Sequence, residues 1–205
     1  HSDRWFGVQH GALVKPIHPG VTYGYEDTHA LAAVFQGKQA GYTYGRQINP
    51  TVEALQRKVT AMENGLATVC FGTGIAAIGT AIVALLKSGD HVVTSQFLFG
   101  NTASLFQTFE RHGIEVSFVD ATEVAQVEKA LRPNTRMVFT ETIANPRTQI
   151  ADLAGIGALC AERSLLYVVD NTITTPFLFQ PVNVGAHLVV NSLTKYIGGH
   201  GNALG

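Results

Sequence analysis

From about residue 67 onward, the chain alternates short apolar runs, rich in β-branched residues, with longer segments of helical periodicity. Parallel strands covered on both faces have this continuous apolar character, and the helices between them cross back over the sheet. The pattern therefore predicts an α/β fold with a mostly parallel central sheet and helices on both faces. The predicted strands are 67–71, 91–95, 115–119, 136–141, 165–170 and 188–192. The predicted helices are 74–86, 101–112, 123–131 and 152–163.

The first 49 residues lack such a period. Residues 1–24 contain scattered Pro and Gly, which predicts an extended arm or irregular lead-in, and residues 37–50 are typical of a loop. Asn49 followed by Pro50 is a helix-start signal, and we expect that helix to end at Gly65. The sequence thus predicts an N-terminal arm and loop region (1–49) and a larger domain (50–205). Because the chain ends in a Gly-rich stretch just after a strand, we expect the larger domain to be incomplete and to belong to the front part of a longer protein.

Composition excludes several classes of protein. Charged residues make up 14% of the 205, against roughly 25% in an average soluble domain. The net charge of −1 gives no electrostatic footprint for nucleic acid or an anionic membrane. The longest apolar run, 75–86, is shorter than the ~20 residues that span a bilayer, and no secretory leader opens the chain. We therefore expect a cytoplasmic protein with Cys70 and Cys160 reduced, and the low charge favours burial against other subunits.

Polar and aromatic side chains follow several of the predicted strands. In open parallel sheets, ligands bind beyond the carboxyl ends of the strands, so these side chains should meet at one edge. A phosphate-binding loop, an aromatic ring, carboxylates, an amide, hydroxyls and a lysine together predict a pocket for a planar, phosphorylated, electrophilic cofactor. The residues concerned are 72–74, Phe99, Glu141, Asn145, Asp170, Thr172, Ser192, Thr194 and Lys195.

The glycine loop GTGIAA at 72–77 matches the pattern G-x-G-x-x-A between a strand and a helix. Backbone N–H groups at a helix N-terminus hold anions, aided by a helix dipole equivalent to roughly +0.5 charge. A dinucleotide site would need an acidic residue about 20 residues further on, but the next strand ends in Ser95 and Gln96. A monophosphate site is favoured, and a plain tight turn remains the alternative.

Lys195 follows a strand and precedes a Gly-rich turn, so we expect it to face the pocket rather than bulk solvent. A lysine there can act as a nucleophile in Schiff-base formation. Asp170 ends the run LLYVVD and is either a turn cap or a carboxylate that keeps a pyridine nitrogen protonated.

Four motifs resemble one known family. They are GTGIAAI (72–78), ETIANP (141–146), VVDNT (168–172) and SLTKYIGGHGN (192–202). Together, in this order and at this spacing, they resemble the cystathionine γ-synthase-like enzymes of cysteine and methionine metabolism, and the likeness runs along essentially the whole chain. This family has fold type I and depends on pyridoxal 5'-phosphate. Within it, the sequence most resembles the O-acetyl- and O-succinylhomoserine sulfhydrylases.

The resemblance implies a role for each pocket residue. Lys195 would carry the cofactor covalently and later move protons, and Asp170 would pair with the pyridine nitrogen. The backbone of Gly74 and Ile75 and the hydroxyls of Ser192 and Thr194 would hold the phosphate. Asn145 would lie near the phenolic oxygen of the cofactor. The roles of Glu141 and His200 stay open.

The resemblance also implies an assembly with shared active sites. Tyr44 and Arg46 in YTYGR match the loop that reaches the phosphate of a neighbouring subunit, so the protein would be a homodimer at least and usually a tetramer. An ordinary exposed loop is the alternative for these two residues. One departure is Phe99, which stands where most members stack a tyrosine; it can stack but has no hydroxyl for acid–base work. By the same resemblance, residues 1–49 would be an N-terminal arm and inter-subunit loop region. The arginine that binds the substrate carboxylate would lie in a C-terminal domain outside these 205 residues.

The expected activity is a γ-replacement on O-acyl-homoserine with sulfide or cysteine as the nucleophile. A γ-lyase acting on methionine, cystathionine or homocysteine is the alternative, and the change at Phe99 weighs against it. A Rossmann dehydrogenase and a non-catalytic scaffold are more distant alternatives. The histidines show no ligand spacing, so we predict no metal site.

Overall fold

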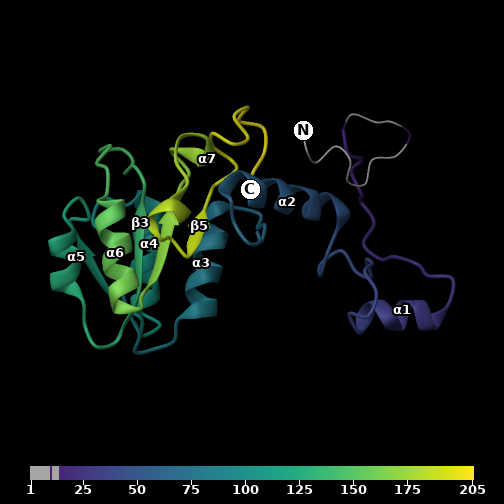
Figure 1. Ribbon diagram of the computed structural model, residues 1–205, viewed down its shortest axis with the longest axis horizontal. Coiled ribbons are helices and arrows are strands. Elements are labelled where there is room, and N and C mark those ends of the chain that lie inside the picture. Colours follow the sequence, from purple (N-terminus) through teal and green to yellow (C-terminus); the bar gives the residue numbers. More distant parts are fainter. Residues whose placement is uncertain (1–9, 11–13) are drawn as a thin grey trace. The chain divides into compact units, whose positions relative to one another are not determined.

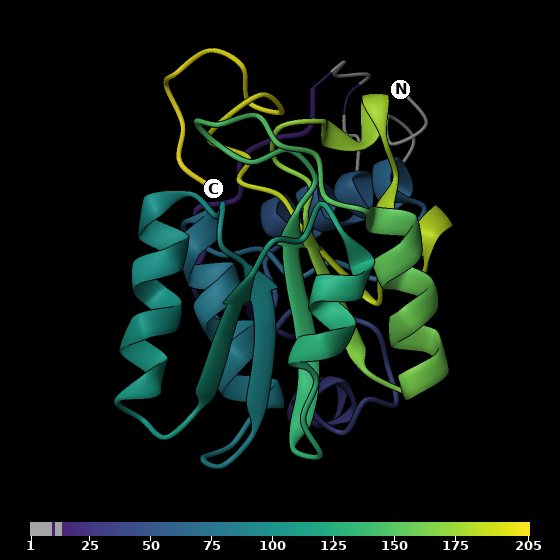
Figure 2. The same cartoon turned by 90° about the vertical axis from the view of Figure 1, so that its left-hand side faces the viewer.

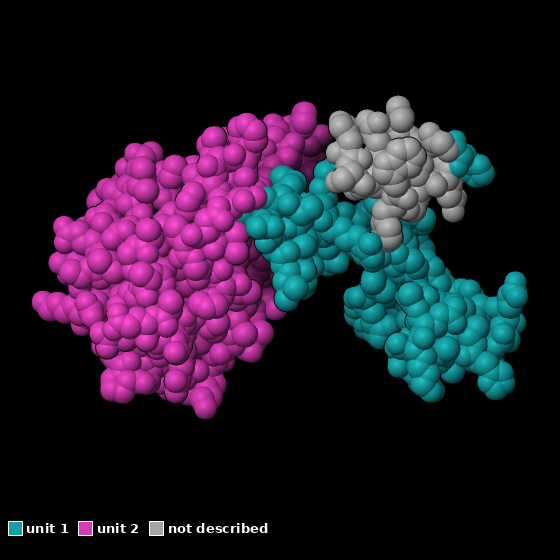
Figure 3. Space-filling view, in the orientation of Figure 1, with its two compact units in different colours: residues 1–70 teal, residues 71–205 magenta. Residues whose placement is uncertain are grey.

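The computed structural model describes residue 10 and residues 14–205. The chain divides into two units, residues 1–70 and residues 71–205 (Figure 3). The larger unit contains a five-stranded sheet, which explains why most of the predicted strands and helices fall there.

All five strands of the larger unit are parallel, in the order β2-β1-β3-β4-β5. Figure 1 labels β3 and β5. They are β1 (His91–Ser95), β2 (Glu115–Val119), β3 (Thr135–Glu141), β4 (Leu166–Asp170) and β5 (Leu188–Val190). The parallel sheet confirms the fold predicted from the alternating pattern. Every residue of β1 is buried, as expected of an apolar strand near the middle of a covered sheet.

Helices cover both faces of this sheet. The helices α3 (Gly74–Leu85) and α4 (Gly100–Glu110) share one core with Phe139 and Val168. The helices α5 (Val124–Ala130) and α6 (Leu153–Arg163) share a second core with the adjacent Val138 and Val169. Figure 2 shows α5 and α6 in front of the strands. The strands thus send alternate residues into two cores, one on each side of the sheet.

Two short helices follow β4. The helix α7 spans Thr175–Leu178, and the 3-10 helix η2 spans Pro181–Val184. The buried amide of Asn171 donates to the carbonyl oxygen of Phe179 at 2.9 Å, which ties this segment back to the end of β4. This hydrogen bond therefore holds the segment that contains α7 close to the carboxyl end of β4.

The predicted strand at 67–71 is wrong. None of the described strands pairs with it, and the side chain of Val69 is 69% exposed. An apolar run becomes a strand only when its backbone groups find partners, and this run joins the two units instead. The last predicted strand is also shorter than expected, because β5 ends at Val190 and residues 191–192 already belong to the following loop.

In the described part of the smaller unit there are two helices, α1 (Thr28–Phe35) and α2 (Pro50–Glu63). The predicted start of α2 is confirmed, since the side-chain oxygen of Asn49 accepts the Thr51 N–H at 2.9 Å and Pro50 opens the helix. The helix ends at Glu63 rather than at Gly65, because Asn64 takes the left-handed conformation (φ 53°) expected of a C-terminal cap. Helix α1 was not predicted. The predicted lead-in at 1–24 lies partly outside the described residues.

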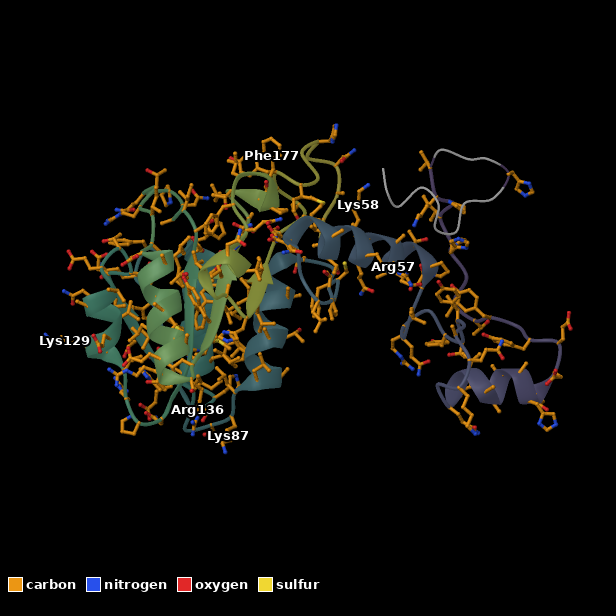
Figure 4. All side chains as sticks on the ribbon, viewed as in Figure 1. Arg57, Lys58, Lys87, Lys129, Arg136 and Phe177 are labelled. Carbon is orange, nitrogen blue, oxygen red and sulfur yellow. The ribbon has the colours of Figure 1, made fainter. Side chains whose placement is uncertain are left out.

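The two ends of the sheet differ in character. At the amino end, His91 is fully buried, with its ring nitrogens 2.8 Å from Thr135 Oγ1 and 2.9 Å from Ser117 Oγ. Figure 4 shows Lys87 and Arg136 at this end of the unit, opposite Phe177 on α7. His91 is thus held inside the fold by hydrogen bonds to neighbouring strands, and the polar groups of the motifs gather at the other end. Among the described helices, none is both long and apolar enough to cross a membrane.

Candidate active site

A cavity of about 580 Å³ lies within the larger unit, at the carboxyl ends of its strands. Its lining comes from the start of α3 and from the segments that follow β1, β3, β4 and β5. This is the edge of the sheet where the sequence predicts a pocket. Eight of the ten predicted site residues line it: Gly74, Ile75, Phe99, Asn145, Asp170, Ser192, Thr194 and Lys195.

The glycine loop begins helix α3 at the cavity wall. Thr73 caps the helix, with its hydroxyl oxygen accepting the Ala76 N–H at 3.1 Å. A Cβ on Gly74 would lie 2.8 Å from the Cβ of Ser192, which is closer than real side chains approach. Glycine thus allows the first turn of α3 to approach the Ser192 side chain closely. The N–H groups of Ala76 and Ala77 bond to Thr73, which leaves those of Gly74 and Ile75 as the candidate donors at the start of the helix. These are the donors that an anion such as a phosphate requires.

The loop after β5 brings two hydroxyls and an amine to the same wall. The side chains of Ser192 and Thr194 lie 3.4 Å and 3.1 Å from the carbonyl oxygen of Gly205. A hydroxyl can turn its proton toward another acceptor, so both can also donate to an anion in the cavity. Lys195 lies in the turn that follows, where its backbone N–H donates to the Ser192 carbonyl at 3.1 Å, and its side chain reaches the cavity.

Asp170 is the last residue of β4 and lines the cavity. Its carboxylate accepts the Thr172 N–H at 2.9 Å, and the Thr172 hydroxyl in turn accepts the Ser192 N–H at 2.8 Å. Burial raises the pKa of the Asp170 carboxyl, and the bonds from Thr172 oppose that rise. Within the described part of the chain, Asp170 forms no ion pair. A buried carboxylate of this kind favours a cationic partner in the cavity.

Glu141 is the last residue of β3, directly beside Asp170 on the neighbouring strand. Burial raises the pKa of its carboxyl to about 7, and the charge of Asp170 adds to the rise. Backbone N–H groups of Phe99 and Asn145 donate to the same carboxyl and lower its pKa. The two strands therefore place a pair of carboxyl groups, each with a raised pKa, on one side of the cavity.

Phe99 precedes helix α4, and its side chain, 44% exposed, is one of two aromatic side chains in the lining. The other is Tyr196, directly after Lys195. Sequence reasoning missed Tyr196 as well as Ile143 and Ile173. Each of the three lies one to three residues from a predicted site residue. This closeness in sequence is the one feature that could have identified them as part of the cavity lining. The imidazole of His200 bonds the Gly198 carbonyl oxygen at 2.7 Å, as expected for a role in the turn.

Tyr44 and Arg46 belong to the smaller unit and are not among the residues that line the cavity. The guanidinium carbon of Arg46 lies 4.9 Å from the centre of the Tyr44 ring, a cation–π arrangement. The same loop is anchored to α2, because the Tyr42 hydroxyl donates to the Glu53 carboxylate. Burial, and then hydrogen bonding to Glu53, raise the pKa of Tyr42 to about 12. The part of Tyr44 and Arg46 in a neighbouring subunit's site stays a prediction.

A model of one protein family, the Cys/Met metabolism PLP-dependent enzymes, matches the chain over residues 1–205. The chain belongs to this family. It is 40% identical over 197 residues to an L-methionine gamma-lyase of Fusobacterium nucleatum and 41% identical over 200 residues to a cystathionine gamma-lyase of Bacillus subtilis. It is also 37% identical over 207 residues to an O-acetyl-L-homoserine sulfhydrylase of Corynebacterium glutamicum.

These matches cover 95%, 92% and 100% of the chain but 50%, 52% and 47% of the relatives. The chain therefore spans about half the length of the curated relatives it matches. A crystal structure described as an O-acetylhomoserine (thiol)-lyase of Campylobacter jejuni, with pyridoxyl-lysine monophosphate, superposes with a TM-score of 0.92. That match has 32% sequence identity and covers 100% of this chain and 50% of the other. The recognition of the family, the fold type and pyridoxal phosphate as cofactor are thereby confirmed.

The cavity fits pyridoxal phosphate on its own chemistry. The first turn of α3, with Ser192 and Thr194, offers donors for the phosphate beside a glycine that no other residue could replace without a shift. Asp170 offers a buried carboxylate for a protonated ring nitrogen, and Lys195 offers a primary amine for the aldehyde. The donor set thus has a group for each reactive part of the cofactor.

Proposed function

We propose that the protein catalyses a γ-replacement on an O-acyl-homoserine. In this reaction the bond from the γ-carbon to the ester oxygen breaks and a bond from the γ-carbon to sulfur forms. Sulfide or the thiol of cysteine supplies the sulfur, and the acyl group leaves as a carboxylate. The observation that carries the proposal is the aromatic residue after β1: Phe99, which lines the cavity and has no proton to donate.

The residues of the cavity divide the work. Pyridoxal phosphate, when bound, supplies an electron-withdrawing ring that makes the α-proton of an attached amino acid acidic. Lys195 Nζ accepts a proton from the α-carbon and returns one to the substrate. Asp170 holds a proton at the ring nitrogen by hydrogen bonding to it as a carboxylate. The hydroxyls of Ser192 and Thr194 and the start of α3 bind the phosphate and so fix the position of the ring.

The leaving group distinguishes the substrates. A carboxylate, whose acid has a pKa of about 4, departs without being protonated, whereas a thiolate, whose thiol has a pKa of about 8.5, departs more easily with help from an acid. Phe99 supplies no such acid. An O-acyl ester therefore suits this cavity better than a thioether such as methionine or cystathionine.

The second candidate is a γ-lyase, which releases the sulfur group together with a keto acid and ammonia. The identities of 40% and 41% to relatives named as γ-lyases favour it. Tyr196 also lines the cavity, and a tyrosine hydroxyl is able to donate a proton to a thiolate. Both candidates use the same roles for Lys195 and Asp170.

Product analysis separates the two. The purified protein is incubated with O-acetylhomoserine and sulfide or cysteine, and separately with methionine and cystathionine, while thiol, thioether, keto acid and ammonia are measured. The proposal expects homocysteine or cystathionine from the ester, and slow release of keto acid from the thioethers. Rapid release of keto acid and ammonia from thioethers, without replacement of the ester, would establish the lyase instead.

We also propose that the protein works as a homo-oligomer, a dimer at least, with Tyr44 and Arg46 completing the site of a neighbouring subunit. The anchoring of their loop by Tyr42 and Glu53, and the pairing of Arg46 with Tyr44, support a loop prepared to bind an anion. Light scattering gives the mass of the assembly. Arg46→Ala should weaken cofactor binding while the assembly persists; unchanged cofactor affinity would contradict the shared site.

A further inference from the structure

Glu141 has no role in the proposed reaction, yet it lines the same cavity as Asn145, Asp170 and Lys195. It is the register partner of Asp170, on the neighbouring parallel strand. In β3, Phe139 faces the core under α3 and α4, and Glu141, two residues on, lies on the same face of the sheet. In β4, Val168 and Asp170 repeat this arrangement. The two carboxyl groups therefore lie side by side on the face that α3 and α4 cover.

Glu141 also anchors the segment that carries Phe99. Phe99 is the N-cap residue of α4, and its side chain makes no capping hydrogen bond. In a capping box, a glutamate at the third helical position accepts the N–H of the cap residue. The third helical residue of α4 is Thr102, so the N–H of Phe99 is accepted instead by Glu141 at the end of strand β3. Its Oε1 lies 2.9 Å from the Phe99 nitrogen. Its charge is favoured there by the dipole of α4.

We propose that Glu141 is a positioning residue of the cofactor site. Its carboxyl group fixes Phe99 by accepting the backbone N–H of Phe99, and its protonation is coupled to the charge of Asp170. The inference rests on pyridoxal phosphate as cofactor and does not depend on whether the reaction is a replacement or an elimination. The backbone N–H groups of Phe99 and Asn145 bond to this one side chain, and the charge of the Asp170 carboxylate on β4 acts on it.

The groups that face Glu141 determine how its proton responds to the cofactor. Asp170 on β4 is the nearest charge, and Lys195 and Tyr196 are the other titratable residues of the lining. The α4 segment and the loop after β3 contribute the uncharged Phe99 and Asn145. A protonated ring nitrogen beside Asp170 would offset the negative charge there and favour the ionised form of Glu141. Cofactor binding and loss of the Glu141 proton are therefore linked near neutral pH.

Three variants test the proposal. Glu141→Gln keeps an oxygen that accepts the Phe99 N–H but removes the charge, and Glu141→Ala removes both. Asp152→Ala is the matched control, because Asp152 caps α6 by accepting the Gly155 N–H at 3.0 Å and does not line the cavity. The measurements are the dissociation constant of pyridoxal phosphate from pH 6 to 8 and the circular dichroism of the bound cofactor.

Glu141→Ala should weaken cofactor affinity by about 10-fold and change the circular dichroism band, since the Phe99 segment loses a hydrogen bond to a charged group. Glu141→Gln should keep the band but lose the part of the pH dependence that the wild type shows between pH 6 and 8. The ionisations of the cofactor itself are common to both proteins, so the difference reports Glu141. Asp152→Ala should lower the melting temperature and leave both measurements unchanged.

Two results would overturn the proposal: wild-type affinity and dichroism in Glu141→Ala, or an unchanged pH dependence in Glu141→Gln. If Glu141→Ala does not fold, the pH dependence of Glu141→Gln still decides. A wild-type protein that takes up no pyridoxal phosphate would contradict the cofactor assignment and this inference with it, whereas a lyase result in the product analysis would contradict only the proposed reaction.

Discussion

Glu141 and Asp170 are register partners at the carboxyl ends of β3 and β4, so two carboxyl groups stand next to each other in one partly buried cavity. Burial raises the pKa of both carboxyl groups, and the charge of Asp170 raises that of Glu141 further. A site of this kind favours a cation, and the ring nitrogen of pyridoxal phosphate is one when protonated.

This pair makes the stability of the cofactor-free protein depend on pH. The pKa of Glu141 is raised from 4.5 to about 7, so the folded state binds its proton more tightly than the unfolded state does. The contribution to stability is complete below pH 4.5 and is lost as the pH rises through 7, on a scale of roughly 3 kcal/mol at most. Urea unfolding at pH 5 and pH 8 should show this loss in the wild type and a smaller loss in Glu141→Gln. Equal losses would contradict the shifted pKa.

Asp170→Asn should separate stability from function. The variant removes a buried carboxyl that has no cationic partner among the described residues, so the free energy of unfolding of the cofactor-free protein should stay level or rise by about 1 kcal/mol at pH 7. Activity should fall by at least about 100-fold, because an amide cannot hold the ring nitrogen protonated. Chemical denaturation and a steady-state assay measure the two effects. A large loss of stability would mean that Asp170 supports the fold.

Two glycines of α3 offer a matched pair of substitutions. A Cβ at Gly74 would meet the Ser192 Cβ at 2.8 Å, whereas at Gly79 the nearest atom is a Leu105 methyl at 3.9 Å, an ordinary contact. Gly74→Ala should cost about 1–3 kcal/mol and weaken cofactor binding. Gly79→Ala should stabilise the helix by roughly 0.5–1 kcal/mol and leave cofactor binding unchanged. Thermal melts and cofactor titrations of both variants check this; similar effects would show that Gly74 has no special place at the phosphate.

Phe99→Tyr tests the leaving-group argument. The new hydroxyl adds a proton donor at the cavity wall, so elimination from a thioether substrate should become at least about 10-fold faster. Turnover of an O-acyl ester should change much less, because its carboxylate leaves without a proton. The ratio of kcat/KM for the two substrates is the measurement. An unchanged ratio would mean that another group, such as the Tyr196 hydroxyl, already supplies the proton.

The sheet was predictable from the sequence because its strands are buried on both faces. His91–Ser95 is buried at every position, and such a run needs no knowledge of its neighbours to be recognised. The run at 67–71 has similar composition but no pairing partner among the described strands, and composition alone does not reveal that. Helix α1 was missed for the opposite reason: none of its residues is buried, so no core-facing stripe marks it.

The sequence predicted most of the residues that line the cavity, but not which of them lie next to or bond to one another. Strand-end positions bring Asp170, Ser192 and Lys195 to one edge in any open parallel sheet. The neighbour of Glu141 depends on the register of β3 against β4, and its bond to Phe99 joins residues 42 apart in sequence. Neither can be read from local pattern, which is why the role of Glu141 appears only in the structure.

We expect Lys195 to carry the cofactor. Borohydride treatment of the protein loaded with pyridoxal phosphate fixes the covalent link, and mass analysis of proteolytic peptides locates it. A phosphopyridoxyl group should be found on the peptide that contains Lys195 and should be absent from that peptide in Lys195→Ala. A group fixed on a different lysine of the wild type, or on none, would contradict the assignment of Lys195.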